Sequence, residues 1–183
     1  MSQQVIIVSG PPGAGKTSVA EALCERFDRM LHIEVDTLRH MVKAGYRHPW
    51  AGDAQAEEQL LLAIRNAAAI ARESVATRYA VVIDDVVTAE AAAQYRAAFA
   101  GIEAPVHLVT LLPRLDVTLV RDASRRETLP ERVPILHAQL THEVAAGLLP
   151  GAVLDTSDDA DAQVTADRVQ DIVASGAGLL ATE

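Results

Sequence analysis

The 183-residue sequence contains very few cysteine and aromatic residues. Its single cysteine, Cys24, excludes an internal disulfide bond and cannot by itself ligate a metal cluster. The six histidines form no recognisable metal motif, because His142-Glu143 begins like HExxH but Ala146 stands where the second histidine should be. No Ser/His/Asp constellation with a nucleophile elbow is present either. The sequence therefore gives no support to a disulfide framework, a metalloprotease or a serine hydrolase.

Basic charge is also scarce. The formal net charge is −9, of which −6 falls in residues 151–183 and only −3 in residues 1–150. There is no basic arm of the kind that binds nucleic acid, although a basic groove within residues 1–150 is compatible with this distribution. No apolar run approaches the roughly 20 residues that span a bilayer, and the polar start MSQQ is not typical of a signal peptide. We therefore expect a soluble cytoplasmic protein with a single domain over residues 1–183.

The stretch VIIVSGPPGAGKT, residues 5–17, carries the clearest functional motif. It fits GxxxxGK[ST], and four apolar residues lead directly into it, as in a buried parallel strand. In such a loop the backbone N–H groups and the start of the next helix bind phosphate groups. We expect Lys16 to reach the β- and γ-phosphates and the Thr17 hydroxyl to ligate Mg²⁺. The residues expected to bind the nucleotide here are Gly10, Pro11, Pro12, Gly13, Ala14, Gly15, Lys16, Thr17 and Ser18.

Hydrophobic periodicity predicts that strands and helices alternate along the chain. The predicted strands are residues 5–8, 31–35, 79–83, 106–112 and 153–154. The predicted helices are residues 16–27, 37–42, 54–77, 89–99, 115–124, 134–147 and 159–174. This alternation indicates an α/β fold of the P-loop NTPase type, with a five-stranded parallel sheet and helices on both faces. Ligands should bind beyond the carboxyl ends of the strands, where the phosphate loop, Asp36 and Asp84-Asp85 fall.

Two aspartates, Asp84 and Asp85, follow the apolar run of residues 81–83. An acidic residue directly after a buried strand is the Walker B arrangement, in which the carboxylate binds Mg²⁺ directly or through water. Either aspartate fits this position. We favour Asp85 as the magnesium residue and also assign it to the acceptor site. The alternative is that the pair caps the following helix.

Asp36 follows the second predicted strand, and Arg39 comes three residues later. A carboxylate at a strand end beside the phosphate loop has the position of a general base that takes the proton of an acceptor hydroxyl. Arg39 would share a helical face with Asp36, and we expect both to act in catalysis and acceptor binding. The alternative is that Asp36 is the N-cap of the following helix.

Arginines crowd the segment before Pro134, which we predict to be a lid over about residues 121–134. These arginines are Arg121, Arg125, Arg126 and Arg132. A lid of this kind would stabilise the charge on the transferred phosphoryl group and exclude water. We expect Arg125 and Arg126 to act in catalysis, and Arg121 and Arg125 to bind the nucleotide. The alternative is a solvated helix face, because acidic residues are interleaved with the arginines.

The segment GYRHPWAG, residues 45–52, interrupts the helical pattern. It holds Tyr46 and the only tryptophan, Trp50, in a chain with 3% aromatic residues. We predict a substrate-facing flap, in which these side chains pack on a ring or sugar of the acceptor. The alternative is that they cover an edge of the core.

Four segments together resemble chloramphenicol phosphotransferase and its relatives among the small P-loop kinases: GPPGAGKT, IEVDTL, VVIDDVVTAEAAAQ and the arginine-rich lid. The chain is also similar to the kinase domain of polynucleotide 5'-hydroxyl kinases, whose DxxR pair matches Asp36 and Arg39. The resemblance implies a nucleoside-kinase-like sheet, ATP or GTP as donor, Mg²⁺ as cofactor and Asp36 as acceptor base. It also implies that the loop at residues 155–157 borders the nucleotide base, which brings in Thr156. Residues 40–58 match neither the antibiotic kinase nor a basic nucleic-acid channel closely enough to name the acceptor.

These features predict an ATP- or GTP-dependent O-phosphotransferase acting on a small-molecule hydroxyl, for example an antibiotic that it inactivates or a nucleoside-like natural product. The first alternative is a polynucleotide or nucleoside 5'-hydroxyl kinase, although we do not expect a nucleic-acid partner. The second is a nucleotide-dependent switch without transfer activity. That alternative leaves Asp36 and Arg39 without a role, and no guanine-specifying NKxD sequence is present. We expect no membrane partner, and the sequence does not indicate an oligomeric state.

Overall fold

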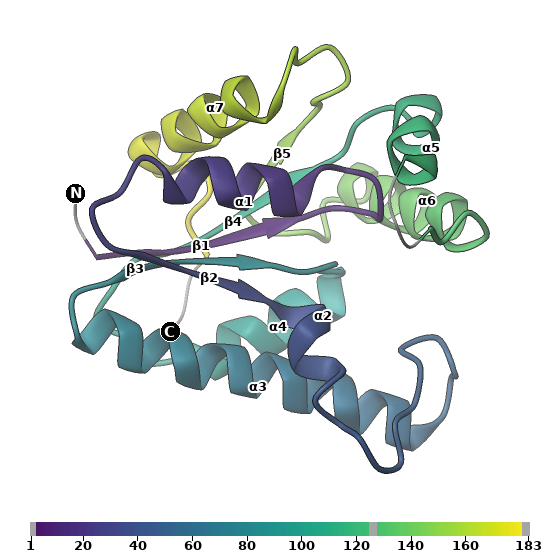
Figure 1. Ribbon diagram of the computed structural model, residues 1–183, viewed down its shortest axis with the longest axis horizontal. Helices are drawn as coiled ribbons and strands as arrows, with labels where there is room; N and C mark the ends of the chain where they lie inside the picture. Colours follow the sequence, from purple (N-terminus) through teal and green to yellow (C-terminus); the bar gives the residue numbers. More distant parts are fainter. Residues whose placement is uncertain (1–2, 125–127, 181–183) are drawn as a thin grey trace.

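The computed structural model describes residues 3–124 and 128–180 of the chain. Its strands are β1 (Val5–Ser9), β2 (Met30–Glu34), β3 (Ala80–Asp84), β4 (Val106–Leu111) and β5 (Ala152–Leu154). They form one sheet in the order β2-β3-β1-β4-β5, and every neighbouring pair is parallel (Figure 1). This confirms the predicted α/β fold with a five-stranded parallel sheet.

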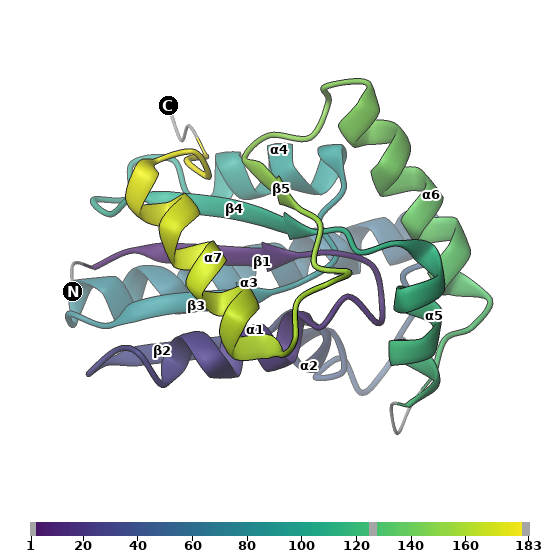
Figure 2. The same cartoon turned by 90° about the horizontal axis from the view of Figure 1, so that it is seen from above.

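Seven helices accompany the sheet in the described residues. They are α1 (Lys16–Cys24), α2 (Val35–Arg39), α3 (Ala54–Ala76), α4 (Ala89–Ala98), α5 (Leu115–Ala123), α6 (Arg132–Ala145) and α7 (Ala162–Ser175). Helices α1 and α7 cover one face of the sheet, and α3 and α4 cover the other (Figure 1). Helices α5 and α6 lie beyond the carboxyl end of the sheet, as Figure 2 shows. Across the described ranges, no helix is both long enough and apolar enough to cross a membrane.

The apolar run in β1 reflects burial on both faces of the sheet. Val5 and Ile7 belong to the core cluster under α3 and α4, whereas Ile6 and Val8 belong to the cluster under α1 and α7. Successive side chains of a strand point to opposite faces. A central parallel strand with helices on both sides therefore needs apolar residues at every position. This burial holds β1 rigidly at the centre of the sheet and fixes the start of the phosphate loop.

Neither Asp36 nor the Asp84-Asp85 pair caps a helix, which was the alternative role considered for each. Helix α2 begins at Val35 and not at residue 37, so Asp36 lies inside its first turn, and Glu34 occupies the N-cap position. The helix after β3 is capped by Thr88, whose side chain accepts a hydrogen bond from a backbone N–H group in α4. The carboxylates of Asp36 and of the Asp84-Asp85 pair are thus available for other contacts.

Several predicted helix boundaries are wrong by two or three residues, among them the end of α2, which lies at Arg39 and not at residue 42. Helix α1 ends at Cys24, three residues before the predicted end. Helix α7 was expected to begin at Asp159, but Asp161 accepts a hydrogen bond from the first turn and caps it, so the helix begins at residue 162. Helix α6 begins at Arg132, two residues before Pro134. Proline is tolerated there because the first turn of a helix leaves its N–H groups without intrahelical partners.

Candidate active site

The phosphate loop, residues 10–15, connects β1 to α1 at the carboxyl edge of the sheet. Gly13 has a φ of +82°, and a Cβ atom there would lie 2.3 Å from the Thr118 carbonyl oxygen in α5. Only glycine combines this conformation with so close an approach. Lys16, the first residue of α1, donates a hydrogen bond from Nζ to the Pro11 carbonyl oxygen at 3.2 Å. The ammonium group is therefore held over the loop, in the position where phosphate groups would bind.

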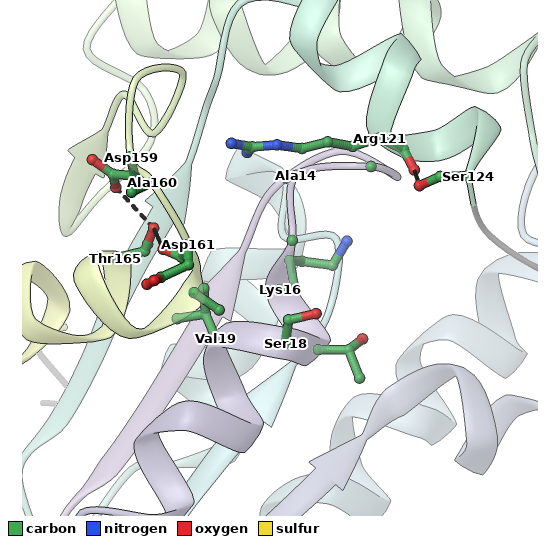
Figure 3. Close-up of a pocket in the computed structure, with 14 residues that line it drawn as sticks. Ala14, Lys16, Ser18, Val19, Arg121, Ser124, Asp159, Ala160, Asp161 and Thr165 are labelled. Atoms are coloured by element: carbon green, nitrogen blue, oxygen red, sulfur yellow. Dashed lines mark hydrogen bonds between the residues drawn. The ribbon is translucent and has the colours of Figure 1, made fainter.

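A cavity of about 410 Å³ opens beside this loop. It is lined by residues 13–19, by Arg121 of α5 and Ser124 directly after α5, and by residues 159–162 and Thr165 around the start of α7. Figure 3 shows that the α5 side chains approach from one side and the α7 segment from the other, with the P-loop between them. The volume lies within the range of small-molecule sites. The cavity can accept a nucleotide whose phosphates lie on the loop.

Arg121 and Thr156, both predicted to bind the nucleotide, contact each other at this cavity. Arg121 donates from Nη2 to the Thr156 carbonyl oxygen at 3.0 Å. Thr156 is buried in the loop after β5. Arg121 lines the cavity, but Thr156 does not. In the described part of the chain, the residues of this loop that line the cavity are 159–162. The contact therefore ties α5 to the loop that borders the other side of the cavity.

Asp84, the last residue of β3, lies beside the phosphate-binding residues. It forms a hydrogen bond of 3.1 Å with His32 Nε2 on the neighbouring strand β2, and the nearby Thr17 hydroxyl helps to lower the pKa of its carboxylate. Burial raises the pKa of Asp84, but the His32 hydrogen bond, the charge of Lys16 and the Thr17 hydroxyl outweigh burial and lower it below the ordinary value. Burial lowers the pKa of His32, and the hydrogen bond and charge of Asp84 outweigh that effect and raise it. Asp84 is thus an ionised carboxylate next to the Thr17 hydroxyl.

Asp85 lies in a different environment, among groups from α2 and α4. Its carboxylate is only 1% exposed. Oδ1 accepts hydrogen bonds from Arg39 Nη2 at 2.7 Å and from the Val86 N–H group at 2.8 Å, and Oδ2 accepts one from the Tyr95 hydroxyl at 2.9 Å. Burial raises the pKa of Asp85, whereas the charge of Arg39 and the Tyr95 hydroxyl act in the opposite direction. Both oxygens of Asp85 therefore already have protein partners.

The structure brings Thr17 together with Asp84 and not with Asp85, which the sequence analysis favours as the magnesium residue. Alternation along the strand explains this placement. Val82 packs in the cluster under α1 and α7, whereas Ile83 packs in the cluster under α3 and α4. Because side chains two residues apart lie on the same face of the sheet, Asp84 lies with Val82 on the α1 side, and Asp85 lies with Ile83 on the α4 side.

Asp36 presents an exposed carboxylate at the carboxyl edge of the sheet. Its side chain is 72% exposed, and Oδ1 accepts a hydrogen bond from Arg39 Nη1 at 2.5 Å. The Arg39 side chain is only 10% exposed and is held between Asp36 and Asp85. The predicted pair of Asp36 and Arg39 is thus in direct contact, and the buried Asp85 neutralises the arginine from below.

Because Arg39 and Asp85 form a buried pair, replacing Asp85 by alanine is expected to lower the free energy of unfolding by about 3–5 kcal/mol. The variant leaves the Arg39 guanidinium without its buried counter-charge and the Tyr95 hydroxyl without its acceptor. Urea unfolding followed by circular dichroism measures the change. Asp36→Ala, which removes the exposed partner of the same arginine, is the control and should cost no more than about 1 kcal/mol. Equal losses in the two variants would contradict the burial argument.

The predicted flap contains a series of ring contacts. The centroid distances are 5.3 Å from His40 to Tyr46, 5.3 Å from Tyr46 to His48 and 4.8 Å from His48 to Trp50. The Arg132 guanidinium lies over the Trp50 ring, 5.3 Å from its centroid. Trp50 is 44% exposed and belongs to neither core cluster, so covering the core does not explain this residue. The flap instead contacts the start of α6.

The Trp50 and Arg132 contact is expected to contribute about 0.5–1 kcal/mol of coupling to the stability of the protein. A double-mutant cycle with Trp50→Ala, Arg132→Ala and the double variant measures this coupling by chemical unfolding followed by circular dichroism. Arg114→Ala replaces Arg132→Ala in the control cycle, because within the described residues Arg114 pairs with Asp116 and Asp158 and not with a flap residue. Additive effects of Trp50→Ala and Arg132→Ala would show that the contact does not hold the flap.

The described part of the predicted lid includes its two ends. Asp122 is buried in α5 and accepts a hydrogen bond from the Leu129 N–H group at 3.0 Å, which ties the segment before α6 to α5. Arg125 and Arg126, the arginines expected to act in catalysis, lie outside the described residues. Their predicted roles therefore stay predictions.

The sequence analysis missed several residues of the site. They are His32, Tyr95, Ser124, Asp159, Ala160, Asp161, Ala162 and Thr165. His32 lies on an edge strand, two positions before the end of β2, and a polar residue between the apolar Leu31 and Ile33 was the available signal. Tyr95 gave no such signal, because a tyrosine on an amphipathic helix is compatible with either burial or exposure.

The comparisons with known proteins agree with this geometry. Residues 5–146 match the protein family described as "AAA domain". No curated protein sequence matches the chain. Among solved structures, a tunicamycin resistance protein from Deinococcus radiodurans is 19% identical, with 97% of this chain and 98% of that chain covered and a TM-score of 0.67.

Two kinases have the same fold. Shikimate kinase from Acinetobacter baumannii, in complex with shikimate, is 20% identical over 95% of this chain and 94% of that chain, with a TM-score of 0.62. The APS kinase CysC from Mycobacterium tuberculosis, in complex with AMPPNP and APS, is 17% identical over 94% of this chain and 98% of that chain, with a TM-score of 0.63. The chain therefore belongs to the AAA domain family and has the fold of a small P-loop kinase.

Proposed function

We propose that this protein is an ATP- or GTP-dependent O-phosphotransferase that phosphorylates a hydroxyl group of a small molecule, such as an antibiotic or a nucleoside-like natural product. The exposed carboxylate of Asp36 at the carboxyl edge of the sheet carries this proposal. Arg39 donates to Oδ1 of this carboxylate, which leaves Oδ2 as the oxygen that would accept the proton of an acceptor hydroxyl. A protein that only binds or hydrolyses a nucleotide has no need of this pair.

The residues on the other side of the site fit a nucleotide and a magnesium ion. The phosphates would lie on the loop N–H groups and Lys16, and the rest of the donor would extend between Arg121 and the segment before α7. Thr17 and Asp84 lie near each other and offer the hard oxygen ligands that Mg²⁺ takes in kinases, and phosphates and water would complete its shell. When bound, the ion would neutralise charge on the β- and γ-phosphates.

The reaction is a single in-line displacement without a phosphoenzyme. Asp36 Oδ2 accepts the proton of the acceptor hydroxyl while the hydroxyl oxygen forms a bond to the γ-phosphorus. The bond from the γ-phosphorus to the bridging β,γ oxygen breaks, and the nucleoside diphosphate leaves with that electron pair. Arg39 orients the Asp36 carboxylate. Lid arginines, with Arg125 and Arg126 as the leading candidates, stabilise the charge that spreads over the transferred group.

Phosphate transfer from γ-labelled ATP and GTP tests the proposal. The acceptor panel contains hydroxyl-bearing antibiotics, nucleosides and 5'-hydroxyl oligonucleotides, and the likeness to a tunicamycin resistance protein adds tunicamycin to it. Lys16→Ala is the matched control, because it removes the phosphate-binding ammonium group. Label on a small molecule that depends on Lys16 supports the proposal. Label found only in free phosphate contradicts it and favours the nucleotide-dependent switch.

A polynucleotide 5'-hydroxyl kinase is the second candidate, and the contact between Asp36 and Arg39 favours it because that family carries the same DxxR pair. This candidate predicts binding of single strands that weakens steeply with salt, since phosphate contacts displace counterions. The ion pairs of the basic residues near Asp36 argue against this candidate, because these residues already have acidic partners within the protein. Arg39 is paired with Asp36 and Asp85, and Arg47 is paired with Asp53.

A further inference from the structure

Tyr95 is a polar residue in the interior of the domain. It lies on α4 with no exposed surface, and its ring stacks against Phe99 at a centroid distance of 6.3 Å. Its hydroxyl donates a hydrogen bond to Asp85 Oδ2 at 2.9 Å. A buried hydroxyl costs free energy unless it is hydrogen-bonded, and a phenylalanine would fill nearly the same space. Packing alone therefore does not account for a tyrosine at this position.

The Tyr95 hydroxyl is the first of a series of contacts that ends at the proposed base. Asp85 Oδ1 accepts from Arg39 Nη2 at 2.7 Å, and Arg39 Nη1 donates to Asp36 Oδ1 at 2.5 Å. Exposure changes sharply along the series, from the fully buried Tyr95 and Asp85 to an Asp36 side chain that is 72% exposed. The series therefore links a rigid core position to the carboxylate that faces the acceptor.

We propose that Tyr95 is a positioning residue for phosphoryl transfer, because its hydroxyl fixes Asp85, which orients Arg39 and, through Arg39, the Asp36 carboxylate. This inference rests on the proposed function, since it gives Asp36 a role in transfer. It goes beyond that function by assigning a role to a core residue that does not touch either substrate.

The hydrogen bonds of Asp85 explain why the hydroxyl matters. Oδ1 receives two N–H donors, from Arg39 and Val86, whereas within the described residues Oδ2 receives only the Tyr95 hydroxyl. Burial and the adjacent Asp85 carboxylate hold the pKa of Tyr95 well above its ordinary value, so the hydroxyl stays protonated and acts as the donor. Without it, the Asp85 carboxylate can turn about its Cβ–Cγ bond, and Arg39 loses its fixed orientation.

The first test is made without an acceptor. Tyr95→Phe keeps the ring and removes only the hydroxyl, and cooperative unfolding checks that it folds. Nitrogen-15 NMR detects the Arg39 guanidinium signals, which are assigned because they are missing from the spectrum of Arg39→Lys. In the wild type these signals should show slowly exchanging, separate Nη protons. In Tyr95→Phe we expect these signals to broaden or merge. Tyr79→Phe, which removes a hydroxyl from a partly exposed ring at the start of β3, should leave them unchanged.

The second test is kinetic and separates positioning from packing. Tyr95→Phe should lower kcat for transfer about tenfold, with little change in KM for the nucleotide. In an Asp36→Asn background the same substitution should have little further effect, because the hydroxyl acts through Asp36. A purely structural role would reduce the rate equally in both backgrounds.

Unchanged Arg39 signals in Tyr95→Phe would overturn this inference, and so would equal losses of kcat in the two backgrounds. The NMR comparison requires no transfer activity. A wild-type protein that phosphorylates no acceptor would therefore contradict the proposed function, while the Arg39 signals would still decide whether Tyr95 fixes Arg39.

Discussion

The Asp36→Asn protein is expected to transfer phosphate at least about a hundredfold more slowly than the wild type, with nearly unchanged nucleotide affinity. Asparagine has almost the same size as aspartate but cannot take a proton from the acceptor hydroxyl. Asp36 does not line the cavity beside the phosphate loop, so nucleotide binding should persist. Label transfer measures kcat, and calorimetry of nucleotide binding measures the dissociation constant.

Glu34→Gln is the matched control for this experiment. Glu34 is an exposed carboxylate at the end of β2, two residues before Asp36, and it accepts a hydrogen bond from Thr37 and none from Arg39 in the described structure. The substitution makes the same change of charge at nearly the same place. Its rate should stay close to that of the wild type. Comparable losses of transfer rate in Glu34→Gln and Asp36→Asn would show that removing any negative charge here slows transfer. Asp36 would then not be the base.

The second large effect is expected for Asp84→Asn. The variant should need at least about tenfold more Mg²⁺ for half-maximal activity and should transfer phosphate far more slowly at saturating Mg²⁺. The reason is that Asp84, which lies near Thr17, supplies the charged oxygen ligand of the proposed magnesium site. A magnesium titration of the transfer rate at fixed nucleotide concentration measures both quantities.

Asp85→Asn provides the contrast, because the two aspartates are neighbours in the sequence. Asp85 is bound on both oxygens by Arg39, Val86 and Tyr95, so its loss should lower stability and kcat without raising the Mg²⁺ requirement. A raised Mg²⁺ requirement in Asp85→Asn, with a normal requirement in Asp84→Asn, would restore the assignment favoured by the sequence and contradict the one proposed from the structure.

The parts of the fold that could be predicted from the sequence depend on local patterns. The residues before the phosphate loop form a continuous apolar run because the central strand is buried on both faces, and this run, together with the alternation of strands and helices, indicated a parallel sheet. The loop itself is a contiguous motif with fixed spacing. Asp36 and Arg39 are three residues apart on one helix, so their contact at 2.5 Å also follows from local geometry.

The features that were not predicted depend on contacts between distant segments. Which of the two aspartates lies near Thr17 could be known only from the face of β3 that meets α1. The start of α7 was predicted at residue 159 instead of 162, because several aspartates near this boundary are equally suited to precede a helix. The hydrogen bond from Tyr95 to Asp85 joins a helix to a strand end through burial, which periodicity alone does not reveal.

The central claim is that this protein moves a phosphoryl group to a hydroxyl with Asp36 as the base. The most direct measurement is the distribution of label from γ-labelled ATP and GTP over the acceptor panel, with wild-type and Asp36→Asn proteins side by side at matched nucleotide occupancy. The account predicts label on a small-molecule hydroxyl with the wild type and at least about a hundredfold less with Asp36→Asn. Label released only as free phosphate, or equal labelling of the acceptor by both proteins, would contradict it.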